Sequence, residues 1–125
     1  MGKTKVLIID DSFINNLLFT DILEDEGFIV ESLTSGKEAV HKIKDYQPEI
    51  ILLDIMMPKI NGFEVLKKIK KDDIIKDTPV IMITADSKPA SIKLAYELGA
   101  TDYILKPLGA FDLVRTVNSA LKMKK

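Results

Sequence analysis

The sequence predicts an α/β fold in which five parallel strands form an open sheet with helices on both faces. Five short apolar runs recur along the 125-residue chain, and stretches with the apolar spacing of amphipathic helices separate them. Three of the runs are nearly continuous in Val, Ile, Leu and Met, as in strands that are covered on both sides. Alternating strands and helices imply right-handed crossovers, so we expect a doubly wound (βα)5 sheet with strand order 2-1-3-4-5.

The strands are expected where the apolar runs lie, at residues 5–10, 28–33, 49–54, 79–84 and 102–106. The run at 28–33, "FIVESL", is the least apolar and therefore suits a place near an edge of the sheet. Helices are expected where apolar residues recur at helical spacing. These residues are Ile14, Leu18 and Ile22; Ala39, Val40 and Ile43; Val65, Leu66 and Ile69; Leu94, Ala95 and Leu98; and Val114, Val117 and Leu121.

Residues with special backbone preferences stand at the expected boundaries of these elements. Ser12 can cap the first helix, and Gly27 and Gly99 stand where a glycine would follow the last residue of the first and fourth helices. Four prolines fall in connections, where the missing N–H does no harm. They are Pro48, Pro58, Pro79 and Pro107.

Length, composition and charge narrow the class of protein. A chain of 125 residues fits one domain, so residues 1–125 are expected to form a single unit. No apolar run approaches the ~20 residues that cross a bilayer. The 18 basic and 19 acidic side chains give a net charge of -1, which offers no electrostatic basis for direct nucleic-acid binding. The absence of cysteine fits a reducing compartment, so we expect a cytoplasmic protein without contact to a membrane.

Polar residues end four of the five expected strands. Asp10 and Asp11 follow the first, Asp54 the third, Thr84 the fourth and Lys106 the fifth. Polar residues also end strands simply because strands meet solvent, and for any one position that interpretation is the better one. Together, however, they fall on the edge where an open parallel sheet binds ligands, beside the point at which the strand order reverses. This edge is therefore the predicted functional site.

The residue types at this edge suit phosphoryl chemistry. Clustered carboxylates recruit a cation, and ligands that are all oxygen favour a hard ion such as Mg²⁺. Asp54 is the best candidate for a nucleophile because it stands alone after the central strand, whereas Asp10 and Asp11 look like a pair that holds the metal. Lys106 and Thr84 could then donate hydrogen bonds to phosphoryl oxygens.

The segments that carry these residues resemble the receiver domain of two-component response regulators. The similar motifs are "IIDDS", "LLDIMMPKINGFEVL", "VIMITA" and "GATDYILKP". Each alone is weak, but their order and spacing match the family over essentially the whole chain. The resemblance implies the flavodoxin-like fold and a stand-alone phosphorylation switch similar to the chemotaxis regulators of this family.

The resemblance also implies roles for individual residues. Asp54 would accept a phosphoryl group from a phosphohistidine on a sensor histidine kinase or a histidine phosphotransfer protein, in a reaction that needs Mg²⁺. Asp11 and Asp54 would bind the metal directly, Asp10 would bind it through water, and the Met56 carbonyl would be a further ligand. Met56 lies two residues after Asp54, and Asp86 lies two residues after Thr84. Both positions resemble residues of the family that tune dephosphorylation, and both are equally well interpreted as ordinary loop residues.

Thr84 and Tyr103 resemble the switch pair of the family, and Lys106-Pro107 resembles its Lys-Pro step, where the peptide bond is usually cis. Phosphorylation would draw Thr84 inward, and the Tyr103 ring would then swing from solvent into the space beside the fourth strand. The surface formed by the fourth helix, fifth strand and fifth helix would change shape and control an unknown output protein. The chain is expected to be a monomer or a phosphorylation-dependent dimer.

Two other functions use similar chemistry or topology. A Mg-dependent aspartyl-phosphate phosphatase of the haloacid-dehalogenase kind needs a second aspartate two residues after the nucleophile, where this sequence has Met56. A nucleotide or flavin binder needs a glycine-rich phosphate loop after the first strand, and "DDSFINN" contains no glycine. The sequence therefore favours the switch.

Overall fold

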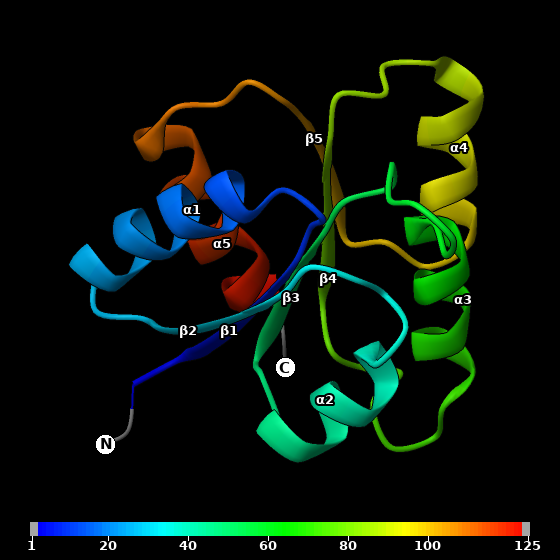
Figure 1. The fold of residues 1–125 in the computed structure, drawn as a ribbon, viewed down its shortest axis with the longest axis horizontal. Coiled ribbons are helices and arrows are strands. Elements are labelled where there is room, and N and C mark those ends of the chain that lie inside the picture. Colours follow the sequence, from blue (N-terminus) through cyan, green and yellow to red (C-terminus); the bar gives the residue numbers. More distant parts are fainter. Residues whose placement is uncertain (1–2, 124–125) are drawn as a thin grey trace.

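The computed structural model describes residues 3–123 and contains a five-stranded parallel sheet with strand order β2-β1-β3-β4-β5 (Figure 1). This order confirms the predicted fold, and the least apolar run forms an edge strand as expected. Every strand boundary lies within one residue of its predicted position. The strands are β1 (Lys5–Ile9), β2 (Ile29–Leu33), β3 (Ile50–Leu53), β4 (Val80–Thr84) and β5 (Asp102–Leu105).

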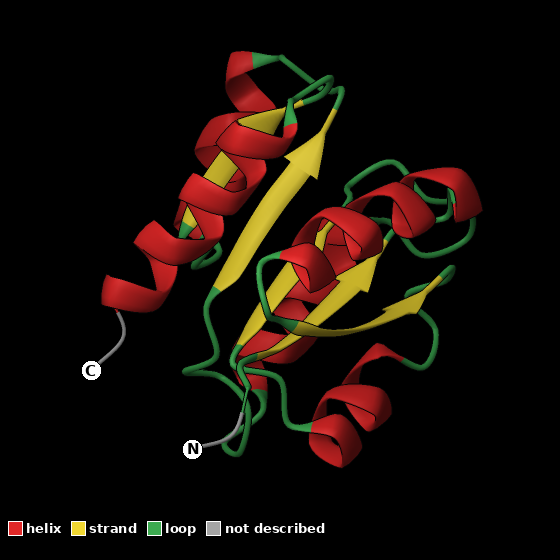
Figure 2. Cartoon of the chain, turned by 90° about the vertical axis from the view of Figure 1, so that its left-hand side faces the viewer, coloured by secondary structure: helices red, strands yellow, loops and turns green. Residues whose placement is uncertain are grey.

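Helices cover both faces of the sheet (Figure 2). They are α1 (Phe13–Asp25), α2 (Ala39–Tyr46), α3 (Gly62–Lys71), α4 (Pro89–Glu97) and α5 (Ala110–Met123). Side chains along a strand point alternately to the two faces, so β1 contributes to two separate cores. Val6 and Ile8 pack in the core with α1 and α5, whereas Leu7 and Ile9 pack in the core with α2, α3 and α4.

The predicted capping residues act as expected. The Ser12 side chain accepts a hydrogen bond from the Asn15 amide and so satisfies one of the free N–H groups at the start of α1. Gly27 follows α1 with φ of +94°, and Gly99 follows α4 with φ of +104°. Residues with a Cβ rarely adopt this left-handed backbone conformation, which explains why glycine follows both helices.

The buried face of α1 differs from the expected one. We expected the helix to bury Ile14, Leu18 and Ile22. The buried residues are instead Asn16, Phe19 and Leu23. Ile22 is partly buried against the core, whereas Ile14 is 70% exposed and Leu18 is also exposed. The first turns of α1 are apolar on more than one side, so the spacing of apolar residues does not single out the face that meets the sheet. The exposed side is consequently an apolar surface next to the acidic end of β1.

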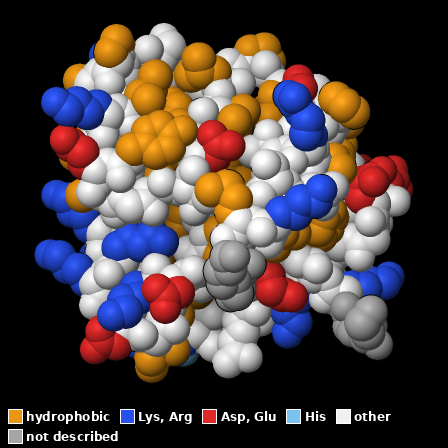
Figure 3. Space-filling view, turned by 180° about the vertical axis from the view of Figure 1, so that it is seen from behind, with side chains coloured by type: hydrophobic (Ala, Val, Ile, Leu, Met, Phe, Trp, Pro, Cys, Tyr) orange, Lys and Arg blue, Asp and Glu red, His pale blue; other side chains and the backbone are white. Residues whose placement is uncertain are grey.

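The outer surface is mixed in character. Lys, Arg, Asp and Glu side chains are interspersed with hydrophobic ones on the face shown in Figure 3. Within residues 3–123, no helix combines the length and the apolar character that crossing a membrane requires.

Candidate phosphoryl-transfer site

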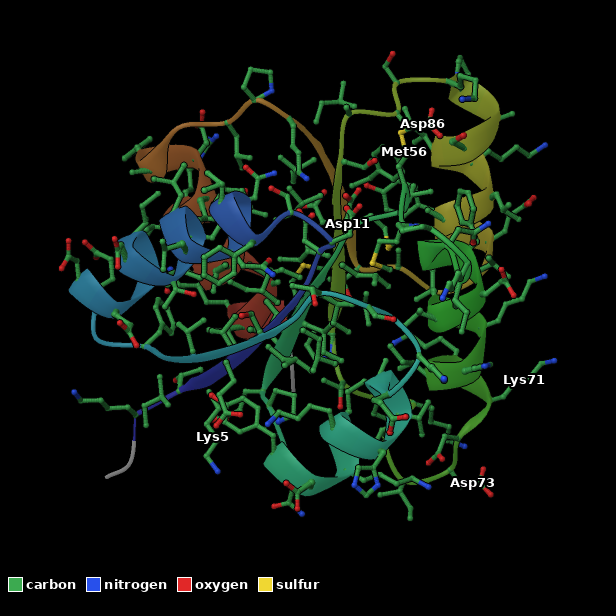
Figure 4. All side chains as sticks on the ribbon, viewed as in Figure 1. Lys5, Asp11, Met56, Lys71, Asp73 and Asp86 are labelled. Atoms are coloured by element: carbon green, nitrogen blue, oxygen red, sulfur yellow. The ribbon has the colours of Figure 1, made fainter. Side chains whose placement is uncertain are left out.

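The predicted site residues meet at one edge of the sheet, where the strands end. Ile9 of β1 pairs with Leu53 of β3, so the residues that follow them, Asp10 and Asp54, lie side by side. Asp54 also donates its backbone N–H to the Ile9 carbonyl oxygen at 2.9 Å. Figure 4 shows Asp11 at this end of the sheet, whereas Lys5 and Asp73 lie at the opposite end. The β-strand register thus converts residues far apart in sequence into one cluster.

Three carboxylates form the centre of this cluster. One oxygen from each of Asp10, Asp11 and Asp54 lies within 4.8 Å of the other two. Asp10 is 3% exposed and Asp54 is 6% exposed, whereas Asp11 is open to solvent. The Ser12 amide donates to Asp10 Oδ1 at 2.9 Å and fixes the orientation of that carboxylate. The cluster therefore has two buried members and one member that a solute can reach.

The donor set of the cluster fits Mg²⁺. The three side chains offer only carboxylate oxygens, and hard divalent cations prefer oxygen ligands to nitrogen or sulfur. Like charges this close repel one another, and a cation would relieve that repulsion. The exposed carboxylate of Asp11 leaves room for the water ligands that Mg²⁺ usually keeps.

Lys106 contacts both buried carboxylates. Its Nζ lies 2.6 Å from Asp10 Oδ2 and 3.4 Å from Asp54 Oδ2, and the side chain is 18% exposed. The Lys106-Pro107 peptide bond is cis, as the resemblance implied. The ammonium group therefore stands beside the oxygen that we expect to react, within reach of a group attached to it.

Burial raises the pKa of Asp54, the nearby Lys106 ammonium opposes this shift, and the Asp10 carboxylate adds to it. The Met56 amide also favours the charged form, because it donates to Asp54 Oδ1 at 3.3 Å. The Lys106 ammonium and the Met56 amide therefore stabilise the ionised form of Asp54. The contact of Met56 with Asp54 is made through its amide, so a metal-binding role for its carbonyl stays a prediction.

The switch residues lie close together on β4 and β5, but Tyr103 is not in the expected position. Thr84 is fully buried at the end of β4, and its Oγ1 accepts from the Asp86 amide at 3.3 Å. We expected the Tyr103 ring to face solvent before phosphorylation. Instead it is partly buried, and its hydroxyl donates to the Asp86 carbonyl oxygen at 2.6 Å. Burial and the charges of Asp86 and Asp54 raise the pKa of Tyr103 to about 12, so the hydroxyl is a donor at neutral pH.

Two polar residues near the site were not predicted. Asn16 is 2% exposed, and its side-chain amide donates to the carbonyl oxygens of Asp10 at 2.9 Å and Leu33 at 3.3 Å. It ties α1 to the ends of β1 and β2. Its spacing from Phe19 and Leu23 places it on the same helix face as these two residues, which is a signal that the sequence contains. The second residue, Ser91, shows no comparable signal and contacts Asp86.

Comparison with known proteins shows the family and the fold of the chain. The family model of the response regulator receiver domain matches residues 6–118. A CheY-like receiver domain protein of Methanospirillum hungatei has the same fold with a TM-score of 0.92 and 28% identity, covering 98% of this chain and 97% of that one. The chemotaxis protein CheY4 of Vibrio cholerae gives a TM-score of 0.90 and 30% identity, covering 95% of this chain and 99% of that one.

Curated relatives are longer than this chain. The transcriptional regulatory protein CpxR homolog of Haemophilus influenzae is 38% identical over 119 residues, which are 95% of this chain and 51% of that protein. The chain spans about half the length of the curated relatives it matches. The match over residues 6–118, together with the sheet order and the grouped aspartates, shows that the chain belongs to the response regulator receiver domain family of two-component systems.

Proposed function

We propose that this chain is a phosphorylation-activated signalling switch, in which Asp54 accepts a phosphoryl group from a phosphohistidine on a sensor histidine kinase or a histidine phosphotransfer protein. Receiver domains are signalling domains, and family membership supports the class of function. The observation that carries the assignment to Asp54 is its buried carboxylate, which lies 3.4 Å from the Lys106 ammonium and within 4.8 Å of the two other aspartates.

The proposed step is an in-line displacement at phosphorus. A carboxylate oxygen of Asp54 attacks the phosphorus atom, and the bond between phosphorus and the donor imidazole nitrogen breaks. The electron pair of that bond returns to the imidazole ring, whose other nitrogen carries a proton, so the ring leaves as neutral histidine. Lys106 and Thr84 donate hydrogen bonds to the phosphoryl oxygens. Mg²⁺ held by Asp10, Asp11, Asp54 and the Met56 carbonyl would offset the negative charge on those oxygens.

The proposed role also concerns the catalytic activity, the location, the extent of the domain and the output partner of the chain. We propose that the chain catalyses only its own phosphorylation and dephosphorylation, acts in the cytoplasm, and forms one receiver domain over residues 1–125. Its output would be a protein that binds the surface of α4, β5 and α5. Some relatives are named DNA-binding regulators, but a net charge of -1 offers these 125 residues no overall electrostatic attraction to DNA. The phosphatase alternative lacks its second acid, because Met56 occupies that position.

The function is tested with a small phosphodonor such as acetyl phosphate, added with Mg²⁺. We expect one phosphoryl group per chain, bound as an acyl phosphate that hydroxylamine removes. Mass spectrometry of the intact chain, before and after hydroxylamine, measures both properties. A modification that resists hydroxylamine, or one that maps to the exposed His41, would contradict the assignment to Asp54. Rapid turnover of p-nitrophenyl phosphate would favour the phosphatase instead.

Removal of the exposed carboxylate should weaken Mg²⁺ binding. We expect Asp11→Ala to lower Mg²⁺ affinity by about tenfold or more, because a direct ligand matters at least as much as the outer-shell groups that cost about 10–100-fold when lost. Titration calorimetry or NMR titration measures the dissociation constant. Asp21→Ala is the matched control, since Asp21 is also an exposed aspartate near the N-terminus but lies in the middle of α1. Equal Mg²⁺ affinity in both variants would show that the metal site is wrong.

A phosphohistidine reaches Asp54 only if its protein covers the rim of the site, and the adjoining end of α1 is apolar. Four large side chains there are at least half exposed. They are Phe13, Ile14, Leu17 and Leu18. Exposed apolar residues grouped beside a functional site are typical of a protein-binding surface, so we propose that the phosphodonor docks on this face of α1.

Disruption of this face should separate protein donors from small donors. We expect Ile14→Glu to slow phosphotransfer from a phosphorylated histidine phosphotransfer protein by about tenfold or more, as for a hot-spot contact. Phosphorylation by acetyl phosphate should stay within about twofold, because Ile14 does not contact the reacting atoms. The control is Ile74→Glu, since Ile74 is equally exposed but lies next to Asp73 at the opposite end of the sheet. An equal loss with both donors would place Ile14 in the chemical step instead.

A further inference from the structure

Asp86 joins the phosphoryl-transfer site to helix α4 by hydrogen bonds from three of its polar groups. Its amide donates to Thr84 Oγ1 at 3.3 Å, and its carbonyl oxygen accepts from the Tyr103 hydroxyl at 2.6 Å. Its carboxylate oxygen Oδ2 accepts from the Ser91 hydroxyl at 2.7 Å. One residue therefore contacts the end of β4, the ring from β5 and the first turn of α4.

The Asp86 carboxylate lies at the start of α4 and accepts hydrogen bonds from two residues there. Lys88 is the N-cap residue and provides no side-chain hydrogen bond to the helix, and the next residue, Pro89, has no N–H. The Lys88 amide donates to Asp86 Oδ1 at 3.0 Å. Asp86 and Ser91 are each 8% exposed, so water has little access to replace the bond between them. A short hydrogen bond from a hydroxyl to a carboxylate is among the stronger kinds in proteins.

We propose that the bond between Asp86 and Ser91 couples the state of Thr84 to the position of helix α4. This inference rests on the proposed function, because a phosphoryl group on Asp54 is what would move Thr84. When the Thr84 hydroxyl turns toward that group, its contact with the Asp86 amide shifts the Asp86 backbone. The carboxylate moves with its backbone, and the buried Ser91 hydroxyl transmits the movement to the first turn of α4. Asp86 is thus a positioning residue for the output surface.

The bond between Asp86 and Ser91 would stabilise α4 as a cap even if nothing moved. The two roles differ in what they predict for the response to phosphorylation. A cap alone affects the stability of α4 equally with and without the phosphoryl group. A coupling bond is needed for the change at Asp54 to reach α4, because coupling requires an element whose states both sites bias.

The experiment uses NMR of the 125-residue chain with Mg²⁺ and beryllofluoride, a mimic of the acyl phosphate. The local response is the shift of amide signals at residues 54–57 and the beryllofluoride affinity. The remote response is the shift of signals in α4 and at Tyr103. We expect Ser91→Ala to keep the affinity within about twofold and to reduce the α4 shifts to about half or less. Ser91→Thr retains the hydroxyl and should restore them.

Ser87→Ala is the matched control, because Ser87 is an exposed serine in the connection that precedes α4. It should leave both responses unchanged. If Ser91→Ala retains the full α4 response, the bond is a cap only and the coupling is wrong. If the unchanged protein shows no local response to beryllofluoride, the proposed function itself fails, and the coupling falls with it. Should Ser91→Ala not fold, Asp86→Ala replaces it, because alanine cannot bond to the Ser91 hydroxyl, and an undiminished α4 response in that variant would overturn the proposal.

Discussion

Asp54→Asn should accept no phosphoryl group from acetyl phosphate or from a histidine-phosphorylated protein. The amide has nearly the same size as the carboxylate but lacks its negative charge and its nucleophilic oxygen. The substitution also removes the charge repulsion between Asp54 and Asp10, so we expect the fold to persist. Mass spectrometry of the intact chain should show the added phosphoryl group in the unchanged protein and none in the variant.

Asp73→Asn provides the matched control for this loss. Asp73 is an exposed aspartate at the opposite end of the sheet, and its ion pair with Lys76 spans 3.7 Å at the surface. Exposed pairs of this kind contribute little to stability. The control should therefore be phosphorylated like the unchanged chain. Phosphorylation of Asp54→Asn at the normal rate would move the phosphoacceptor to another residue and overturn the proposed function.

The strands were predictable because burial on both faces leaves a strong pattern in the sequence. Ile50 to Leu53 of β3 are all buried, and such a run has few other structural solutions. Helix α1 was harder, because Ile14 and Leu18 are apolar yet exposed and Asn16 is polar yet buried. Periodicity assumes that apolar residues face the core, and here part of the apolar surface lies outside next to the site.

The carboxylates and Lys106 were predictable because each lies one or two residues after a strand, and parallel register brings such positions together. The bond between Asp86 and Ser91 was not, since it depends on how the connection before α4 turns. The inward position of Tyr103 also depends on that connection, which supplies the carbonyl oxygen for its hydroxyl. Spacing alone does not encode contacts that a loop conformation creates.

Gly62 begins α3 and packs directly against the backbone of the phosphoacceptor. A Cβ at this position would lie 2.2 Å from the Asp54 carbonyl oxygen and 2.7 Å from Ile55 Cα. The Gly62 amide also donates to the Ile55 carbonyl oxygen at 2.8 Å, which holds the two segments together. These contacts are with backbone atoms, so no side chain can turn away to make room.

Gly62→Ala should therefore lower the free energy of unfolding by about 3 kcal/mol, the upper part of the usual cost of overpacking, and should also displace Asp54. This loss is a large fraction of the roughly 5–15 kcal/mol that stabilises a typical domain. Urea denaturation measures this loss, and phosphorylation by acetyl phosphate should slow in parallel because the nucleophile moves relative to Lys106.

Gly109→Ala is the matched control, since nothing lies within 4 Å of a Cβ at that glycine. The control should change stability by no more than about 1 kcal/mol, in either direction. If Gly62→Ala is as stable and as readily phosphorylated as Gly109→Ala, then α3 does not hold the phosphoacceptor loop in the way that its contacts indicate.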